Sequence, residues 1–572
     1  MVWSDFLQFY CLKISKNNEI ISNLDFHVLV IGIVGLRHGF QPMNTTMLQH
    51  EKSESFDGNK LRKVIAASSV GTLIEWYDFY IFGSLSVIIA TKFFPSDNPT
   101  AAFLSTLATF AAGFVVRPFG ALFFGRLGDL LGRKYTFLVT LLIMGFSTFA
   151  IGLIPSYSSI GFLAPILVLT LRLLQGLALG GEYGGAATYV AEHAEPNKRG
   201  LRTAWIQTTA SLGLFISLLV ILATKKSMSL EAFNDWGWRI PFLISIVMVG
   251  ISYFIRKNMD ESPLFAQAKQ EGKIVANPLK ESFGKKLNFK FVLLALFGAT
   301  MGQGVVWYTG QFYALSFLQK VANIEFEQSN YIIAISLAAG TGFFIFFGWL
   351  SDKIGRKGIM LAGMLIAICT YRPIYQAMYE LADVNLKTEK ANSRQVQTDY
   401  HMIDGTVTLS KVTRTIYSYT DGTQLLEEKT EKVSHLPSIQ REKAVLKKTV
   451  HVGQHAFWML ILLVFIQVLY VTMVYGPIAA FLVEMFPTAI RYTSMSLPYH
   501  IGNGIFGGLL PAVATYLAAK ANTANEVAAA AGQSLPYAKP YLEGLWYPII
   551  IGGVCFVIGL LYINGKDREI ND

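Results

Sequence analysis

The chain has 572 residues, of which 52% are hydrophobic and only 15% are charged. A water-soluble chain of this length needs more charge to cover its surface, so the composition excludes a soluble globular protein. The net charge of +10 at pH 7 does not indicate a nucleic-acid-binding protein either, because the basic residues cluster at the ends of apolar runs and no nucleic-acid motif accompanies them.

Residues 1–58 are predicted to form a cytoplasmic N-terminal extension. They are polar apart from the run FHVLVIGIVGL at Phe26–Leu36, which is too short to span a bilayer and is followed by no cleavage-site pattern. Translation that starts at Met43 or Met47 is the alternative interpretation, in which the residues upstream are not expressed.

Twelve apolar runs of about 20 residues follow, and a run of that length spans ~30 Å of hydrocarbon. They predict an all-α polytopic membrane protein, with the lipid bilayer as its solvent. The predicted spans are 62–92, 101–124, 134–154, 161–191, 203–223, 238–256, 289–318, 329–350, 358–379, 455–483, 493–518 and 544–563.

The predicted spans divide into two halves of six helices each. The N-terminal half is 59–256, a central cytoplasmic loop follows at 257–288, and the C-terminal half comprises 289–380 and 454–572. The loops after helices two, four and eight are rich in Lys and Arg, whereas those after helices one, three and seven carry few. Because cytoplasmic loops carry such an excess, both termini are expected on the cytoplasmic side of a plasma (inner) membrane.

A hydrophilic insertion at 381–453 interrupts the C-terminal half on the outer side of the membrane. Its sequence DGTVTLSKVTRTIYSYTDG (Asp404–Gly422) is rich in β-branched and aromatic residues and has Asp-Gly at each end. Such runs predict strands joined by tight hairpins, here a three-stranded antiparallel meander near 394–403, 406–420 and 423–433. A disordered loop is the alternative. A sheet this small needs to pack against the helices or a partner to be stable.

The decapeptide GRLGDLLGRK (Gly125–Lys134), between helices two and three, returns as GWLSDKIGRK (Gly348–Lys357) between helices eight and nine. Its first glycine permits close helix approach, its basic residues hold the loop inside, and its aspartate can pair with those cations or with a helix N-terminus. A pair that forms in only one orientation of two half-domains is a conformational latch. Two copies indicate two homologous halves, as in alternating-access carriers. The predicted latch residues are Gly125, Asp129, Arg133, Lys134, Gly348, Asp352, Arg356 and Lys357.

Ionisable residues inside membrane helices are rare and are candidates for function. Glu75 and Asp78 lie on one face of the first helix, and two carboxylates on one turn repel, so one of them is expected to hold a proton near neutral pH. Arg172 and Glu182 share a stripe of the fourth helix, where an arginine can drive a proton off a carboxylate. We therefore predict that these four residues couple transport to protons. The alternatives are that both carboxylates of the first helix are ionised and paired for structure, and that the fourth helix holds a fixed Arg–Glu pair.

Arg117, in the second helix before Pro118, is the other isolated cation within a span. Its guanidinium matches a substrate carboxylate in bidentate geometry, or else it pairs permanently with Asp78 or Glu75. Aromatic and amide side chains commonly line cavities, whereas a histidine such as His500 is more often a packing residue. The C-terminal half is almost free of charge, so coupling is expected in the N-terminal half. The predicted substrate-binding residues are Arg117, Tyr77, Gln175, Gln303, Trp307, Tyr308, Gln311, Tyr499 and Asn503.

The pattern G-x-x-x-D-x-x-G-R-K between helices two and three, which recurs between helices eight and nine, closely resembles the loop signature of the major facilitator superfamily. The R-x-x-Q-G of Arg172–Gly176 resembles the fourth-helix motif of its proton-coupled members. Further segments resemble the metabolite:proton symporter family within that superfamily, over about 60–380 and 455–565. These segments are EWYDFYIFG (Glu75–Gly83), LRLLQGLALGGEYGG (Leu171–Gly185), WGWRIPF (Trp236–Phe242) and Glu261–Pro263.

The resemblance implies the major facilitator fold and the uptake of carboxylates such as oxoglutarate, citrate and shikimate, or of zwitterions such as proline and betaine. We therefore predict a secondary active transporter that couples uptake of a small organic acid or zwitterion to protons by alternating access. It is expected to function as a monomer and to need no cofactor besides the proton gradient. A sugar or other neutral-solute symporter is the nearest alternative, because Glu261–Pro263 also resembles that group. A transporter-like nutrient sensor, suggested by the insertion, is the second alternative.

The sequence contains no P-loop, nucleophile elbow or zinc-binding pattern, so neither a primary pump nor an enzyme is expected. The three cysteines are too few and too scattered to form a metal site.

Overall fold

The computed structural model describes residues 58–94, 105–106, 109, 112–402, 408–434 and 445–563. Gly58–Asp572 form one compact unit. The predicted N-terminal extension at 1–58 lies outside the described residues, except for Gly58.

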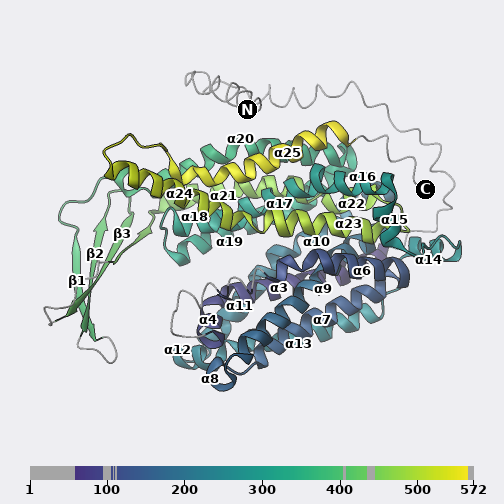
Figure 1. The fold of residues 1–572 in the computed structure, drawn as a ribbon, viewed down its shortest axis with the longest axis horizontal. Helices are drawn as coiled ribbons and strands as arrows, with labels where there is room; N and C mark the ends of the chain where they lie inside the picture. The colour runs from purple at the N-terminus through teal and green to yellow at the C-terminus, as the bar shows by residue number, and fades with distance from the viewer. Residues whose placement is uncertain are drawn as a thin grey trace. The chain divides into compact units, whose positions relative to one another are not determined.

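The N-terminal half is a bundle of long helices (Figure 1). They are α3 (Gly58–Ser84), α4 (Ser86–Phe93), α6 (Arg117–Leu131), α7 (Arg133–Leu153), α9 (Leu163–His193), α10 (Arg199–Gln207), α11 (Thr209–Lys226) and α13 (Arg239–Lys257), with the short elements α8 (Tyr157–Ile160), η4 (Pro196–Lys198), α12 (Leu230–Ala232) and η5 (Phe233–Gly237) between them. α9 packs against α3, α6 and α7, and α13 packs against α3 and α7.

Two short helices form most of the central loop, and both begin where their sequences predict a helix start. α14 (Pro263–Gln270) has Ser262 as its N-cap and α15 (Pro278–Gly284) has Asn277; both cap side chains accept a hydrogen bond from the backbone three residues on. A polar N-cap followed by proline is a favoured beginning for a helix, because proline has no N–H to satisfy and its φ is already helical.

The C-terminal half repeats the bundle with more irregular helices. They are α16 (Lys286–Ala295), η6 (Leu296–Thr300), α17 (Met301–Tyr308), η7 (Thr309–Tyr313), α18 (Ala314–Lys320), α19 (Phe326–Ile354), α20 (Arg356–Ala382), η8 (Val384–Leu386), α21 (Gln454–Tyr475), α22 (Ile478–Met485), α23 (Arg491–His500), η9 (Ile501–Gly507), α24 (Leu510–Ala530), η10 (Pro540–Leu545) and α25 (Trp546–Tyr562). α21 packs against α19 and α20, and α25 packs against α17 and α20.

Ten helices of the described part are long and apolar enough to cross a membrane. They correspond to ten of the twelve predicted spans. The first predicted span is α3 with α4, which are separated at Leu85, and α3 is less apolar because it carries Glu75 and Asp78 as well as basic residues in its first turns. The second predicted span, 101–124, lies partly outside the described residues and ends within α6.

The seventh and eleventh predicted spans contain π-helical turns, η6, η7 and η9, that the sequence did not predict. These helices meet backbone to backbone, because a Cβ atom at Gly304 would lie 2.4 Å from the carbonyl oxygen of Gly502. π-turns interrupt α-helices most often at functional sites. Here they lie where the seventh and eleventh helices pack against each other.

The insertion forms a four-stranded antiparallel sheet of order β1-β2-β3-β4. The strands are β1 (Gln395–Met402), β2 (Thr408–Ser418), β3 (Gln424–Ser434) and β4 (Val445–His451). The first three confirm the predicted meander, and β4 was not predicted. Its central Lys447 and Lys448 hid the strand pattern, but they lie opposite Glu428 and Glu427 of β3, and Lys448 Nζ lies 3.0 Å from Glu427 Oε1.

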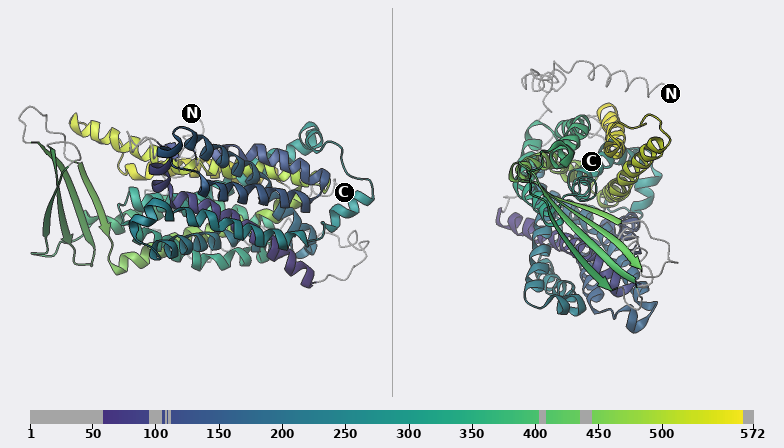
Figure 2. Two further views of the ribbon diagram at one scale, coloured as in Figure 1. Left: turned by 90° about the horizontal axis from the view of Figure 1, so that it is seen from below. Right: turned by 90° about the vertical axis from the view of Figure 1, so that its left-hand side faces the viewer.

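The sheet is attached to the C-terminal half at one end (Figure 2). The Val450 N–H donates to the Asn323 carbonyl at 2.7 Å, and Val452 exchanges two hydrogen bonds with the Gln328 amide. Beyond this root the edge strand β1 is largely exposed, including Val396 at 66% and Tyr400 at 61%, whereas most described side chains of β2 and β3 are half-buried.

A further contact at the root joins Asp421 to Lys387, whose Nζ lies 2.6 Å from Asp421 Oδ2. Burial raises the pKa of Asp421, but hydrogen bonds from Lys387 and Thr423 lower it further, so its pKa lies below its usual value. The ion pair is therefore fully formed at neutral pH.

Candidate functional site

A pocket lies inside the N-terminal half, between α3, α6, α7 and α9. Its charged and amide side chains are all ones that the sequence singled out, namely Glu75, Asp78, Arg117, Arg172 and Gln175. Apolar side chains and glycines complete its wall; these are Phe79, Gly113, Phe114, Met144, Gly176 and Leu179.

Glycines of α9 bring the two arginines to the same pocket. A Cβ atom at Gly176 would lie 2.2 Å from the Gly113 carbonyl oxygen, and one at Gly180 would lie 2.2 Å from that of Arg117. α9 therefore lies directly against the backbone of the second helix, as expected for glycines four residues apart. This contact places Arg117 and Arg172 in one wall of the pocket.

A chain of hydrogen bonds links Arg172 to Asp78. Arg172 Nη1 donates to Gln175 Oε1 at 2.8 Å, Gln175 Nε2 donates to Thr148 Oγ1 at 2.6 Å, and the Thr148 hydroxyl donates to Asp78 Oδ2 at 2.6 Å. The Arg172 guanidinium also lies 4.1 Å from the Phe82 ring centroid. Sequence reasoning missed Thr148, because a single hydroxyl in an apolar helix carries no signal.

Three polar atoms of the pocket are buried without a hydrogen-bond partner among the described residues. They are Glu75 Oε2, Asp78 Oδ1 and Arg117 Nε. Within the described part of the chain, no ion pair joins Arg117 to either carboxylate, so the permanent pair considered as an alternative is not observed. Arg117 instead lies over the Phe114 ring, 4.2 Å from its centroid. Buried polar groups without a partner are unfavourable and are candidates for binding a ligand or a proton.

Aromatic side chains of both halves meet beside the pocket. Trp76 of α3 lies 5.0 Å from Trp307 of α17, and Tyr80 of α3 stacks on Phe312 of η7 at 6.2 Å between centroids. Tyr308 lies 4.8 Å from Trp307. We call these five residues the aromatic cluster.

Other predicted residues of the C-terminal half form polar and stacking contacts. Gln303 and Asn503 exchange two amide hydrogen bonds, at 3.1 and 2.8 Å. Tyr499 stacks on Tyr183 at 3.7 Å and shares a 2.7 Å hydrogen bond with the Tyr475 hydroxyl. His500 is buried, and Gln311 is buried within η7.

Of the coupling and substrate-binding residues predicted in the N-terminal half, two lie outside the pocket. The Tyr77 hydroxyl donates to the Pro241 carbonyl at 2.9 Å and packs α3 against α13, so it is not placed to bind substrate. Glu182 does not pair with Arg172, as one alternative supposed, but forms an ion pair with Arg256 at 2.7 Å. Arg256, at the end of the sixth span, was not singled out because it resembles an ordinary basic residue that flanks a span.

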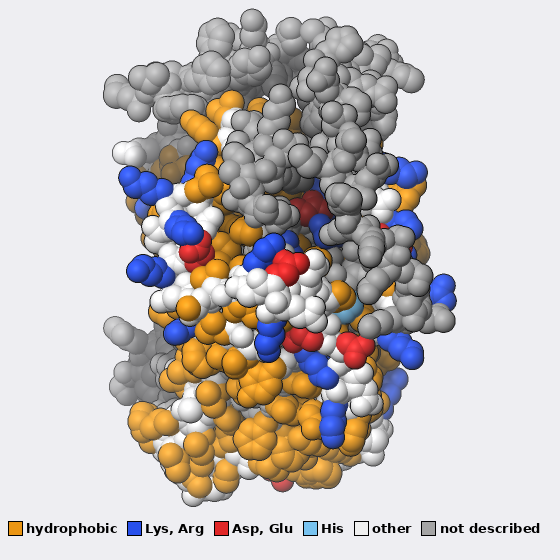
Figure 3. Space-filling model, turned by 90° about the vertical axis from the view of Figure 1, so that its right-hand side faces the viewer, with side chains coloured by type: hydrophobic (Ala, Val, Ile, Leu, Met, Phe, Trp, Pro, Cys, Tyr) orange, Lys and Arg blue, Asp and Glu red, His pale blue; other side chains and the backbone are white. Residues whose placement is uncertain are grey.

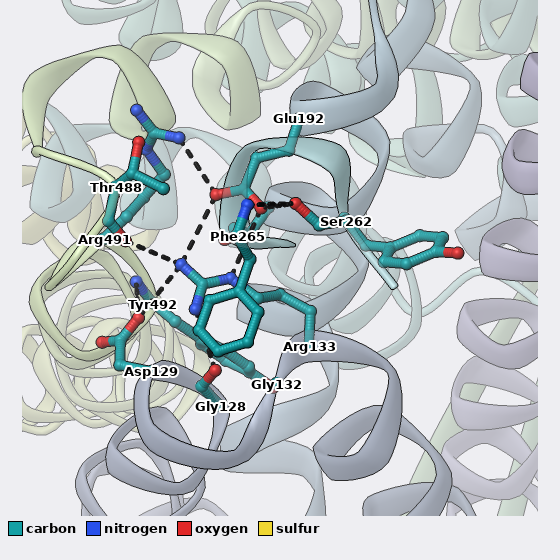
Figure 4. Close-up of polar contacts among 12 residues, drawn as sticks. Gly128, Asp129, Gly132, Arg133, Glu192, Ser262, Phe265, Thr488, Arg491 and Tyr492 are labelled. Carbon is teal, nitrogen blue, oxygen red and sulfur yellow. Dashed lines mark hydrogen bonds and ion pairs between the residues drawn. The ribbon is translucent and has the colours of Figure 1, made fainter. Parts of the chain in front are cut away.

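The first decapeptide joins the two halves (Figure 4). Asp129 accepts hydrogen bonds from the backbone N–H groups of Thr493 at 2.8 Å and Tyr492 at 3.3 Å, in the first turn of α23. It also lies 3.2 Å from Arg133, and both side chains are fully buried. A carboxylate at a helix N-terminus satisfies free N–H groups and matches the helix dipole. Asp129 therefore caps a helix of the opposite half.

Arg133 extends this connection. It donates to the Thr488 carbonyl at 2.7 Å and lies 3.4 Å from Glu192 of α9. Glu192 also pairs with Arg491 at 3.0 Å and accepts a hydrogen bond from the Ser262 hydroxyl. The buried network thus includes residues of both halves and of the central loop.

The second decapeptide makes the equivalent contacts from the C-terminal half to the N-terminal half. Asp352 accepts hydrogen bonds from the backbone of Gly200 and Leu201, both at 2.8 Å, and so caps α10 of the N-terminal half. Arg356 donates to Asp352 at 2.7 Å and to Glu484 at 2.7 Å. Two pseudo-symmetric sets of contacts therefore join the halves at this end.

The glycines of the decapeptides have two distinct roles. A Cβ atom at Gly125 would lie 2.9 Å from Thr493 Cα, and one at Gly348 would lie 2.4 Å from Ala204 Cβ, so the first glycine of each copy permits the close approach that was predicted. Gly132 and Gly355, which were not singled out, have φ of 121° and 95°, a conformation that glycine adopts easily in the turn between two helices.

The two lysines of the decapeptides do not join the halves. Lys357 donates to the carbonyls of Leu560 and Ile563 at the end of α25. The backbone of Lys134 donates to Glu261, which caps the start of α7. Glu192, Glu484 and Glu261 were not predicted as site residues, although the repeated Glu, Pro and Arg around Glu192 and Glu484 were visible in the sequence.

The end of the helices that carries the decapeptides is basic. Figure 3 shows Lys and Arg side chains gathered over this face. The loops contribute exposed Arg126, Lys198 and Lys353. The distribution is the one from which a cytoplasmic location of these loops was predicted.

Known proteins similar to the chain are transporters. Residues 63–387 match the family model described as "Sugar (and other) transporter". The chain is 37% identical over 342 residues to the inner membrane metabolite transport protein YhjE of Escherichia coli, covering 58% of this chain and 76% of that protein. It is 35% identical over 339 residues to the α-ketoglutarate permease of E. coli, covering 59% of this chain and 77% of that protein. It is 35% identical to the proline/betaine transporter of Salmonella typhimurium, covering 56% of this chain and 65% of that protein, slightly less than two thirds.

A solved structure confirms the fold. The proton:xylose symporter XylE, of the major facilitator superfamily, superposes with a TM-score of 0.62 over 89% of this chain and 97% of that one. The sequence identity is 14%, so the likeness concerns the fold.

Proposed function

The chain belongs to the Sugar (and other) transporter family, with the major facilitator fold, and from that premise we propose that it takes up a small organic acid or zwitterionic metabolite by proton symport. It is an integral multi-pass membrane protein and not an enzyme. The observation that carries the proposal is the buried pocket that holds two carboxylates and two guanidinium groups.

The two arginines are the groups that bind the substrate carboxylate. A planar guanidinium donates two parallel hydrogen bonds to a carboxylate, and the interaction is strong where water is excluded. Arg117 Nε is buried without a hydrogen-bond partner among the described residues, and Arg117 lines the pocket with Arg172. This arrangement fits an anionic group on the substrate, in keeping with the α-ketoglutarate permease among the relatives.

The aromatic cluster is suited to a cationic or apolar part of the substrate. Trp76 packs against Tyr80 and Trp307, and aromatic faces attract organic ammonium groups. A zwitterion would then place its carboxylate on the arginines and its ammonium on these rings. The proline/betaine transporter among the relatives supports this second substrate class.

Charge balance explains how the proton and the substrate move together. With both carboxylates and both arginines ionised the pocket is neutral, a bound proton adds a positive charge, and a bound carboxylate adds a negative one. An uncompensated charge in a closed low-dielectric site is strongly unfavourable. The pocket therefore closes readily when it is empty or when it holds a proton together with a singly charged anion, which couples the two movements. A zwitterion adds no net charge, so this balance applies to anionic substrates.

The contacts of Asp129 and Asp352 close one end of this pathway. We expect their loops in the cytoplasm, so the state described is proposed to be closed toward the inside. The capped α10 and α23 then separate when the pocket opens inward. This exchange of contacts is the predicted latch. The transporter acts as a monomer in the plasma (inner) membrane, with both termini inside and the proton gradient as its energy source.

A sugar or another neutral solute is the second candidate, favoured by the description of the matching family. Fluorescence of the purified protein distinguishes the two, because Trp76 and Trp307 lie in the aromatic cluster. Titration with α-ketoglutarate, shikimate, proline, glycine betaine and xylose is expected to quench tryptophan fluorescence with one of the first four ligands and not with xylose. Saturable binding of xylose alone would overturn the proposal.

A further inference from the structure

A buried ion pair lies in the N-terminal half outside the pocket. Glu182 of α9 accepts a hydrogen bond from Arg256 of α13 at 2.7 Å, and each side chain is 1% exposed. The Thr140 hydroxyl donates to the other oxygen of Glu182 at 2.9 Å, and Arg256 donates to the Phe137 carbonyl at 2.9 Å. Because burying two charges is unfavourable and apolar residues often pack equally well, an ion pair at this depth points to function.

The pair lies directly against α3 at Gly71. A Cβ atom at Gly71 would lie 1.3 Å from Arg256 Nη2 and 2.8 Å from Glu182 Oε1. Glu75 follows one turn later on the same face of α3, and its Oε2 has no hydrogen-bond partner among the described residues. Arg256 therefore lies close to two carboxylates, of which it hydrogen-bonds one.

The position of Glu182 along α9 places it between the two sites described above. Gln175, about two turns before Glu182, lines the pocket, and Glu192 belongs to the network at the joined end. A proton on Glu182 has therefore left the pocket in the direction of the decapeptides.

We propose, on the basis of the proton symport proposed above, that Arg256 is a positioning residue whose ion pair passes from Glu182 to Glu75 as a proton passes from Glu75 to Glu182. The O–H bond of protonated Glu75 breaks and an O–H bond forms on Glu182. Arg256 then pairs with the carboxylate that has lost its proton, so the total charge does not change. Other ionisable side chains around these groups include Asp78, Arg117, Tyr183, Tyr308, Tyr475, Tyr492 and Tyr499.

Four single variants test the relay in proteoliposomes. Glu182→Gln removes the proton acceptor, Arg256→Lys keeps the charge but loses the planar fork, and Gly71→Ala places a methyl group where Arg256 lies. Gly83→Ala is the matched control, because it lies on the same helix with nothing within 4 Å of its added Cβ. Two rates are measured for whichever of α-ketoglutarate, shikimate, proline and glycine betaine the wild type exchanges: exchange at equal pH, and accumulation driven by a pH gradient.

Glu182→Gln and Gly71→Ala are expected to retain exchange and lose accumulation, with a partial loss in Arg256→Lys and none in Gly83→Ala. Full accumulation in Glu182→Gln would overturn the relay. Loss of exchange together with accumulation, in a folded Glu182→Gln protein, would also overturn it, because it would show a structural role. If Gly71→Ala does not fold, Glu182→Gln decides, since it keeps the size of the side chain. A wild-type protein that shows exchange but no pH-driven accumulation would refute the proposed symport itself. A wild-type protein and variants that all show pH-driven accumulation would refute only the relay.

Discussion

Glu75 and Asp78 are buried within one turn of each other, and each has a carboxylate oxygen without a hydrogen-bond partner among the described residues. Asp78 is linked to Arg172 through Gln175 and Thr148. Glu75 lies one turn of α3 after Gly71, against which the Glu182–Arg256 pair packs. The two carboxylates thus have different surroundings. In the mechanism proposed above, Asp78 responds to what binds Arg172, and Glu75 exchanges its proton with the Glu182–Arg256 pair.

Removing either carboxylate tests this division. Glu75→Gln and Asp78→Asn keep the size and lose the ionisable group, so we expect each to abolish pH-driven accumulation while substrate exchange stays within about a factor of ten of wild type. Thr148→Val, which breaks the chain between Arg172 and Asp78, is expected to weaken coupling in the same direction as Asp78→Asn. Full accumulation in both carboxylate variants would remove the first helix from the mechanism.

Variants of Arg117 and Arg172 test whether the substrate carries a carboxylate. Lysine in place of Arg117 or Arg172 keeps the charge but loses bidentate geometry, and loss of a charge-assisted bond in a dry cavity costs on the order of 2–5 kcal/mol, or roughly 30-fold or more in affinity. We expect Arg117→Lys to weaken carboxylate binding in the tryptophan-quenching titration while the protein remains folded. If both variants fold and bind every carboxylate ligand at wild-type affinity, a neutral substrate becomes the better hypothesis.

The sequence identified the pocket residues because a charge in an apolar helix is conspicuous. It could not identify Thr148, whose hydroxyl is ordinary in a membrane helix, or Arg256, whose place at the end of a span hides its burial. Tyr77 was predicted for the substrate site but does not line the pocket, because helical spacing gives the face of a residue only approximately and its hydroxyl bonds the Pro241 carbonyl of α13.

Among the elements, α10 and α23 are the helices on which we propose that opening depends. Each begins with free backbone N–H groups that a carboxylate of the other half satisfies, Asp352 for α10 and Asp129 for α23. Separating the halves exposes both helix ends to water, where solvent replaces the lost bonds. The difference between the two states is therefore small enough to be shifted by ligands.

Asp129→Asn is expected to shift the balance between the two states rather than the affinity of the pocket. The amide keeps one acceptor for α23 and loses the ion pair with Arg133, a change on the order of 1 kcal/mol, or about fivefold in the equilibrium between states. Turnover should fall while ligand affinity changes by less than that factor.

Asp352→Asn should have the same effect, since its contacts are equivalent. Lys134→Gln serves as the control, because it leaves the backbone contact with Glu261 in place. Unchanged turnover in both aspartate variants would contradict a latch.

The sheet is an element that we expect transport not to need. Among the described residues, its contacts with the helices lie at the root, and none of its residues lines the pocket or belongs to the predicted latch. Lys387 and Gly453 both contact Thr423, so the two ends of the insertion lie close enough for a short linker. Replacement of 391–448 by a Gly-Ser linker is expected to leave uptake within about a factor of two of wild type. Loss of uptake with normal membrane insertion would instead assign the sheet a part in transport. If the deletion abolished a cellular response to the nutrient while uptake stayed normal, the alternative of a transporter-like nutrient sensor would be favoured.

Elements were predictable from the sequence where their own residues specify them, and not where contacts between elements do. Three strands were predictable because their β-branched residues lie between Asp-Gly turns, whereas β4 is stabilised by Lys–Glu pairs across strands that appear only once the register is known. The π-turns and the separation of α3 from α4 arise from packing between helices, which no local pattern specifies.

At the scale of the whole molecule, the two halves differ in chemistry although they share a fold. The N-terminal half holds the carboxylates and arginines, and the C-terminal half contributes aromatic and amide groups. The halves meet around the pocket through ring contacts and at the decapeptide end through capped helices. A ligand that contacts both halves therefore biases their relative orientation, and the charge state of one half decides when that movement is favourable.

Simultaneous measurement of substrate and proton influx in proteoliposomes tests whether protons drive uptake through this pocket. A pH-sensitive dye inside the vesicles reports protons while labelled substrate is counted. We predict accumulation only when the outside is more acidic, with about one proton entering per net negative charge of the substrate, as the charge balance of the pocket requires. Both fluxes should be lost in the Glu75→Gln/Asp78→Asn double variant. Accumulation that persists at full extent after the pH gradient is collapsed would contradict the account.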